Sequence, residues 1–208
     1  MYNKQIPRLL CRTFVATTAC ALFAGFSGCA TNFRTIQPLV GKAPPTSLYV
    51  YSFLDAREGA IGPKFLAEVR DQLGKALQSR GVRHKQLWFN DSPLRTEYAL
   101  EGKATGPQSS TRVPVGEIIT ATRGEEEAFG ASHRLVIFPV EVVQSNAFTG
   151  FHVRWDLIDA HTNERNWSAT SYTQHQKWFL GDENPRDRAT SFVEGALAEM
   201  EKAGVFRR

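Results

Sequence analysis

Three polar side chains recur at every second position of one short segment. Residues 151–158 read F-H-V-R-W-D-L-I, so that His152, Arg154 and Asp156 alternate with apolar residues. This alternation predicts a half-buried strand that carries the three polar side chains on its outer face. An imidazole, a guanidinium and a carboxylate on one face could bind an anion or a metal ion. The alternative interpretation is an ordinary solvated strand face with a charge pair.

The next predicted strand carries further candidate residues. His175 could approach the face of His152 and complete a composite ligand site. Trp178 and Phe179, at the end of that strand, form either a partner surface or a cover for the core beneath the last helix.

The sequence contains no recognisable catalytic motif. Its five histidines form no H-x-x-x-H or H-E-x-x-H pair, and there is no G-x-S-x-G elbow and no glycine-rich phosphate loop. We therefore expect no catalytic residues, no metal ligands and no enzymatic activity.

A cysteine closes the apolar stretch near the start of the chain. Lys4, Arg8 and Arg12 precede an apolar run from Thr13 to Phe26, and the chain turns polar after Cys29. The run is too short to span a bilayer, which needs about 20 apolar residues. A basic start followed by a short apolar run predicts a cleaved secretory signal.

The end of this signal resembles the lipobox of bacterial lipoproteins. It reads Phe26-Ser27-Gly28-Cys29, although leucine is usual where Phe26 stands. Small residues before the cysteine fit a peptidase that must reach the backbone, and the thiol of Cys29 would then carry a covalent lipid such as palmitate. The alternatives are Cys20, which has a shorter apolar core before it, and ordinary signal cleavage without a lipid. We expect no other cofactor.

Cleavage before Cys29 changes the composition of the chain. It removes three basic residues and no acidic one, so the formal charge falls from +4 to +1. The basic balance that would favour nucleic acid as a partner therefore belongs to the signal. Cys11 and Cys20 are removed as well, which leaves no pair for a disulfide, and stability must come from a packed core.

The expected organisation is a signal peptide over residues 1–28, a lipidated N-terminus and tether over 29–46, and one globular domain over 47–208 with a long loop at 91–112. The apolar patterns predict an α+β fold in the order β-α-β-(α)-β-β-β-α, with a single mixed, largely antiparallel sheet packed by about three helices. The expected strands lie near 47–54, 84–90, 134–143, 151–158 and 166–179. The expected helices lie near 63–80, 114–131 and 184–203.

The turn after residue 156 carries a family resemblance. Residues 156–167 read D-L-I-D-A-H-T-N-E-R-N-W and are similar to the "L-x-D-x-x-T-G-E-x-x-W" hairpin of several envelope lipoproteins. These are the curli secretion channel subunit, the Pel polysaccharide lipoprotein and the activator lipoproteins of penicillin-binding proteins. Residues 129–137 (F-G-A-S-H-R-L-V-I) also look like the "G-A-D-Y-L-L-x-G" step of that group. Asn163 stands in place of the usual glycine.

The resemblance implies a binding or scaffold role in a Gram-negative envelope assembly or export complex, without catalysis. The expected partners are the membrane, through the lipid anchor, and an envelope protein or a second copy of the chain. Because Ala30 is not Asp, enteric-type sorting would place the protein on the inner leaflet of the outer membrane, facing the periplasm. The alternative is a periplasmic enzyme, or a binder of a small ligand or metal, that uses the face around His152.

Overall fold

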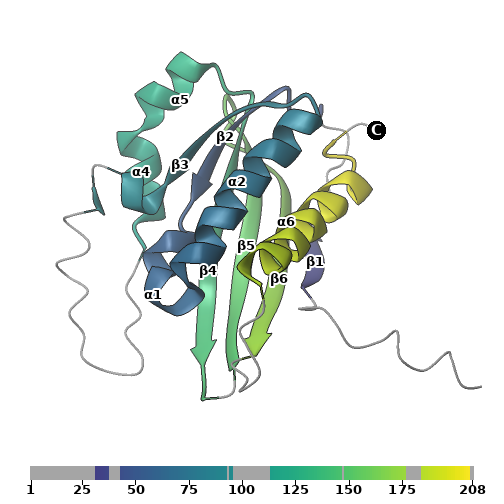
Figure 1. Ribbon diagram of the computed structural model, residues 1–208. Helices are drawn as coiled ribbons and strands as arrows, with labels where there is room; N and C mark the ends of the chain where they lie inside the picture. The colour runs from purple at the N-terminus through teal and green to yellow at the C-terminus, as the bar shows by residue number, and fades with distance from the viewer. Residues whose placement is uncertain are drawn as a thin grey trace, which may run out of the picture.

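The computed structural model of the chain describes residues 31–37, 43–92, 94–95, 113–146, 148–176 and 184–206. Within these ranges, six strands form one open mixed sheet with α-helices on both of its faces (Figure 1). The elements follow one another as β1 (Asn32–Gln37), β2 (Ser47–Ser52), η1 (Leu54–Arg57), α1 (Glu58–Ile61), α2 (Pro63–Ser79), β3 (Arg83–Trp88), η2 (Phe89–Asp91), α4 (Val115–Ala121), α5 (Arg123–Phe129), β4 (His133–Gln144), β5 (Phe148–Asp159), β6 (Arg165–Gln176) and α6 (Pro185–Lys202).

The sheet has the strand order β1-β6-β5-β4-β2-β3. The first three pairings in this order are antiparallel, and the pairings of β2 with β4 and β3 are parallel. The predicted α+β class with a single mixed, largely antiparallel sheet is therefore confirmed.

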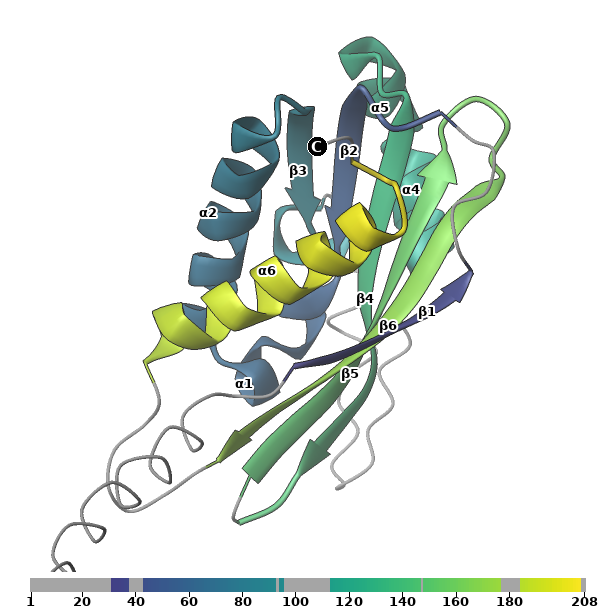
Figure 2. The ribbon, with the colours of Figure 1, turned by 90° about the vertical axis from the view of Figure 1, so that its right-hand side faces the viewer.

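Two hydrophobic layers enclose the sheet because β2 and β4 bury side chains on both of their faces. Leu48 and Val50 of β2 join the larger core under α2 and α6. Tyr49 and Tyr51 point the other way, into the smaller core that also contains Ile118 of α4. Figure 2 shows the sheet between these two sets of helices. A run of six buried residues is what a strand covered on both faces requires, and all of β2 is buried.

Local sequence signals coincide with several element ends. The side chain of Asn184 caps α6 by accepting a hydrogen bond of 3.0 Å from the Arg186 backbone N–H. Gly81 and Gly204 follow α2 and α6 with positive φ angles of 70° and 78°. The register of β4 against β5 shifts between Pro139 and Glu141, so proline marks the bulge that its missing N–H predicts.

The first strand lies inside the segment that was expected to be a tether. Residues 32–37 form β1, which pairs along β6 at the edge of the sheet. Phe33 packs beside Trp155, with ring centroids 6.2 Å apart, and the Thr35 hydroxyl donates to Glu199 of α6. The alternation of Phe33 and Thr35 with Asn32 and Arg34 was the sequence signal for this strand. The folded domain therefore begins well before residue 47.

The helix expected over 114–131 is divided in two. Thr122, between α4 and α5, donates its hydroxyl to the Ile118 carbonyl at 2.7 Å, and nearby glycines 116 and 124 weaken a continuous helix. The signal peptide, Cys29, most of the loop 91–112, and Trp178 and Phe179 lie outside the described residues.

Candidate functional site

The polar face of β5 exists as predicted. Phe151, Val153, Trp155 and Leu157 are fully buried on the side of α2 and α6, so the alternate residues lie on the other face. There the guanidinium of Arg154 lies 3.1 Å from the carboxylate of Asp156, between Nε and Oδ1. This is the charge pair that the solvated-face interpretation expects.

Asp156 is nevertheless buried, with 4% of its surface exposed. Its Oδ1 also accepts a hydrogen bond of 2.6 Å from the Ser168 hydroxyl, and its Oδ2 lies 3.3 Å from Nε of Arg165. Two cations and a hydroxyl thus surround one carboxylate. A closed ion-pair cluster of this kind stabilises the β5–β6 pair and leaves the carboxylate little capacity for a ligand.

The strand register separates His175 from His152. His152 pairs with Tyr172 across β5 and β6, and their rings stack with centroids 4.5 Å apart. His175 pairs with Thr149 and lies three residues after Tyr172, so it projects from the opposite face of the sheet. The composite site of the four residues is therefore not assembled.

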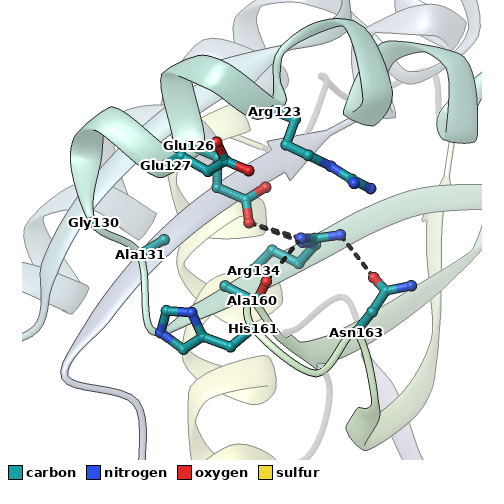
Figure 3. Close-up of a pocket in the computed structure, with 9 residues that line it drawn as sticks. All are labelled: Arg123, Glu126, Glu127, Gly130, Ala131, Arg134, Ala160, His161 and Asn163. Carbon is teal, nitrogen blue, oxygen red and sulfur yellow. Dashed lines mark hydrogen bonds and ion pairs between the residues drawn. The ribbon is translucent and has the colours of Figure 1, made fainter.

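A polar pocket lies instead at the other end of these strands. It has a volume of about 410 Å³, and α5, the start of β4 and the β5–β6 turn enclose it (Figure 3). Its lining residues are Arg123, Glu126, Glu127, Gly130, Ala131, Arg134, Ala160, His161 and Asn163.

A buried ion pair forms the floor of this pocket. Nη2 of Arg134 lies 2.9 Å from Oε1 of Glu126, and the two side chains are only 6% and 3% exposed. Nε of Arg134 donates to the same oxygen at 3.1 Å, and Nη1 donates to Oδ1 of Asn163 at 2.9 Å. The Tyr51 hydroxyl donates to the second oxygen of Glu126 at 2.8 Å. Burial is the largest cause that raises the pKa of Tyr51 above its ordinary value.

The β5–β6 turn has the geometry that its sequence predicts. The carboxylate of Asp159 accepts the backbone N–H groups of His161 and Thr162 at 2.8 and 2.9 Å. Those bonds hold the pKa of Asp159 below its ordinary value. Asn163 adopts φ 59°, the left-handed conformation that asparagine tolerates. Trp167, just beyond the turn, is fully buried in the larger core.

His133 lies beside this turn, at the start of β4. Its Nε2 is 3.1 Å from Nδ2 of Asn166, and its Nδ1 is 3.2 Å from the Ser132 hydroxyl. Because the amide nitrogen is a donor, this contact suits a neutral imidazole that accepts at Nε2. Burial lowers the pKa of His133, which also favours the neutral imidazole.

The ion pair is hidden in the sequence because residues 125–127 read E-E-E, and such a charged run on a helix indicates a solvated face. Glu125 does lie at the surface, where it pairs with Lys85 at 2.9 Å, but Glu126 turns inward. The available signal was Arg134, since a cation at the start of a strand buried on both faces needs a partner.

Besides the Arg134–Glu126 pair, the ionisable side chains that line the pocket are those of Arg123, Glu127 and His161. Its nine lining residues include no hydroxyl or thiol side chain that could act as a nucleophile. Within the part of the chain that the structure describes, no three His, Cys, Asp or Glu side chains gather in a way that could hold a metal ion. No helix of the described residues is long and apolar enough to cross a membrane.

The class defined by this geometry is an α+β domain with an open mixed sheet whose polar clusters are internally paired. No protein-family model matches the chain, and no curated protein matches it. Among solved structures, the PelC dodecamer from Paraburkholderia phytofirmans is 14% identical, with 86% of this chain and 100% of that chain covered and a TM-score of 0.44.

Two further solved structures are similar to the chain. A single-residue variant of the same PelC dodecamer is 13% identical over 81% of this chain and 96% of that chain, with a TM-score of 0.45. Lipoprotein GNA1162 from Neisseria meningitidis is 12% identical over 76% of this chain and 99% of that chain, with a TM-score of 0.41. The resemblance to these proteins is weak, and the descriptions "dodecamer" and "lipoprotein" apply to them.

Proposed function

We propose that this protein is a lipid-anchored, non-catalytic binding or scaffold protein of a Gram-negative envelope assembly or export complex. The observation that carries the proposal is the signal-type sequence that ends at Phe26-Ser27-Gly28-Cys29. A folded domain starts directly after it, because the hydroxyl of Thr31 already bonds to that of Thr173 across 3.2 Å. A lipid on Cys29 would therefore hold a folded surface, rather than a distant tethered domain, at the membrane.

The polar clusters support a binding role rather than catalysis. Arg134, Glu126 and Asn163 satisfy one another at the pocket floor, and Arg154, Arg165 and Asp156 do so on the strand face. Catalytic groups need a free acid, base or nucleophile directed at a substrate. In these two clusters, each charged group is already paired with another.

The proposed location is the inner leaflet of the outer membrane, facing the periplasm. It rests on Ala30, which follows the proposed acylated residue where an aspartate would retain the protein at the inner membrane. The proposed partners are an envelope protein or further copies of this chain.

The anchor is tested with the variant Cys29→Ser, with Cys20→Ser as the matched control. We expect the wild type and C20S to fractionate with the outer membrane and to carry an acylated N-terminal cysteine by mass spectrometry. We expect C29S to lose the acyl mass and to leave the membrane fraction. A processed C29S protein that stays membrane-bound would contradict the proposed anchor.

The binding role is tested by crosslinking the native lipoprotein in membranes and identifying the captured chains. We expect a reproducible envelope protein or a discrete self-adduct, retained in the Cys20→Ser control. A lipoprotein that is acylated but yields only monomer at every crosslinker length would contradict the scaffold role while leaving the anchor intact.

A further inference from the structure

The far end of β4 presents apolar side chains to solvent. The first five residues of the strand, 133–137, are buried, but Val140 and Val143 are 58% and 39% exposed. Together with Ile36 of β1, they are the exposed large apolar side chains of the described residues. Both ribbon views show this end of β4 and β5 extending past the helices (Figures 1 and 2). Exposed apolar patches mark surfaces that meet a partner or a membrane.

The proposed lipid attachment point lies at the same end of the sheet. Thr31 bonds to Thr173, which pairs with Phe151 of β5, which in turn pairs with Val142 of β4. These residues form one row across the sheet, and Val140 and Val143 flank it. With strands about 4.8 Å apart, the row from β1 to β4 is only about 14 Å wide.

The length of chain between Cys29 and Thr31 limits how far this row can lie from the lipid. Cys29 precedes Thr31 by two residues, which span about 7 Å when fully extended. A lipid on Cys29 therefore brings the Thr31 row to the bilayer surface. A linker of two residues therefore keeps the exposed valines within reach of the bilayer surface.

The charges on this face do not favour an electrostatic contact. Arg34 of β1 and Glu141 of β4 are both exposed and carry opposite signs, and Arg154 of β5 is already ion-paired within the sheet. Tyr172 and His152, which lie near them in the sheet, stack on each other. A contact made here is therefore apolar and should depend little on salt.

We propose that the projecting end of β4, at Val140 and Val143, rests on the lipid surface when Cys29 is acylated. This inference rests on the lipid anchor of the proposed function. It adds an orientation, in which the antiparallel half of the sheet faces the bilayer while the pocket floored by Arg134 and Glu126 lies at the far end of β4. The pocket would then open toward the periplasm and its components.

The test uses the full acylated lipoprotein in vesicles of phosphatidylethanolamine and phosphatidylglycerol. In the mature chain Cys29 is the only cysteine, so an introduced cysteine is the single thiol open to labelling. The variants Val140→Cys and Val143→Cys receive an environment-sensitive fluorophore. Lys75→Cys is the matched control, because the Lys75 side chain is 72% exposed on α2, away from the projecting end of β4. Spin-labelled lipids serve as the quencher.

We expect the lipid quencher to reduce fluorescence at positions 140 and 143 several-fold more than at position 75, at low and at high salt. Equal quenching at the three positions in a vesicle-bound, acylated protein would overturn the orientation and leave the anchor standing. Quenching lost at high salt would overturn the apolar contact. The probes could instead be shielded from water without being quenched by lipid, with a shielding that grows as the protein density on the vesicles rises. That result would assign the surface to a contact with a second copy and overturn the proposal. A chain with no acyl mass would overturn the anchor and the orientation together.

Discussion

The guanidinium of Arg134 and the carboxylate of Glu126 form an ion pair 2.9 Å long between side chains that are almost fully buried. The pair connects α5 to the start of β4, and through Asn163 it also connects both to the β5–β6 turn. Removing one partner of a buried ion pair leaves the other charge without compensation. The packing of α5, the start of β4 and the β5–β6 turn against one another therefore depends on the Arg134–Glu126 pair.

Replacing Glu126 with alanine should lower the free energy of unfolding by about 3–5 kcal/mol, because the charge of Arg134 would remain buried. Urea denaturation measures the change. Glu127→Ala, at the exposed neighbouring position, is the control and should change stability by no more than about 0.5 kcal/mol. The double variant Glu126→Leu with Arg134→Leu should be less destabilised than Glu126→Ala. Equal losses for Glu126→Ala and Glu127→Ala would show that the pair does not stabilise the fold.

Asn163 is expected to contribute to stability in two separate ways, through its backbone conformation and through its side-chain hydrogen bond. It holds φ 59° and accepts from Arg134 at 2.9 Å. Asn163→Gly keeps the left-handed conformation and loses the hydrogen bond, whereas Asn163→Ala loses both. Alanine should therefore cost about 1 kcal/mol more than glycine, measured by thermal and urea unfolding. A glycine variant as unstable as the alanine variant would mean that backbone strain at this turn is unimportant.

Stability should fall in mild acid because of His133. Burial lowers its pKa below the ordinary 6.5, so the unfolded chain takes up a proton at a higher pH than the folded chain. The free energy of unfolding contributed by the neutral imidazole is therefore complete above about pH 6.5 and declines as the pH falls toward the folded-state pKa. Measuring unfolding across this range should show a smaller decline in His133→Gln. The same slope in both proteins would assign the effect to another group.

Docking of β1 should depend on Gly195 of α6. A Cβ added there would lie 2.5 Å from Cε2 of Phe33, so Gly195→Ala must displace the Phe33 ring, which fastens β1 to the core. We expect faster amide hydrogen exchange along residues 32–37, even though alanine favours the helix itself. Gly124→Ala in α5 is the control, because no atom lies within 4 Å of its added Cβ. Unchanged exchange in Gly195→Ala would show that Phe33 can move without releasing β1.

The local pattern of the sequence was sufficient for most of the fold. The alternation of residues 151–157 determined which face of β5 is buried, and the doubly apolar run of β2 required cover on both sides. Helix ends and tight turns depend on contacts between near neighbours in the chain, so a single sequence can reveal them. Examples are the cap at Asn184, the glycine at Gly204 and the Asp159–Asn163 turn.

The tertiary structure decided which polar groups meet. Glu126 and Glu125 are adjacent in a charged run, yet one is buried against Arg134 and the other pairs with Lys85 at the surface. The sequence alone allows His175 and His152 to share a face, but the strand register places them on opposite sides. Asn32–Gln37 became a strand only because β6 offered a free edge and α6 left room for Phe33. The sequence by itself determined the periodicities and the cysteine that would carry a lipid. Pairing across the sheet depends on long-range register, which no local window contains, so only the folded chain could place the ion pair, the pocket and the exposed end of β4.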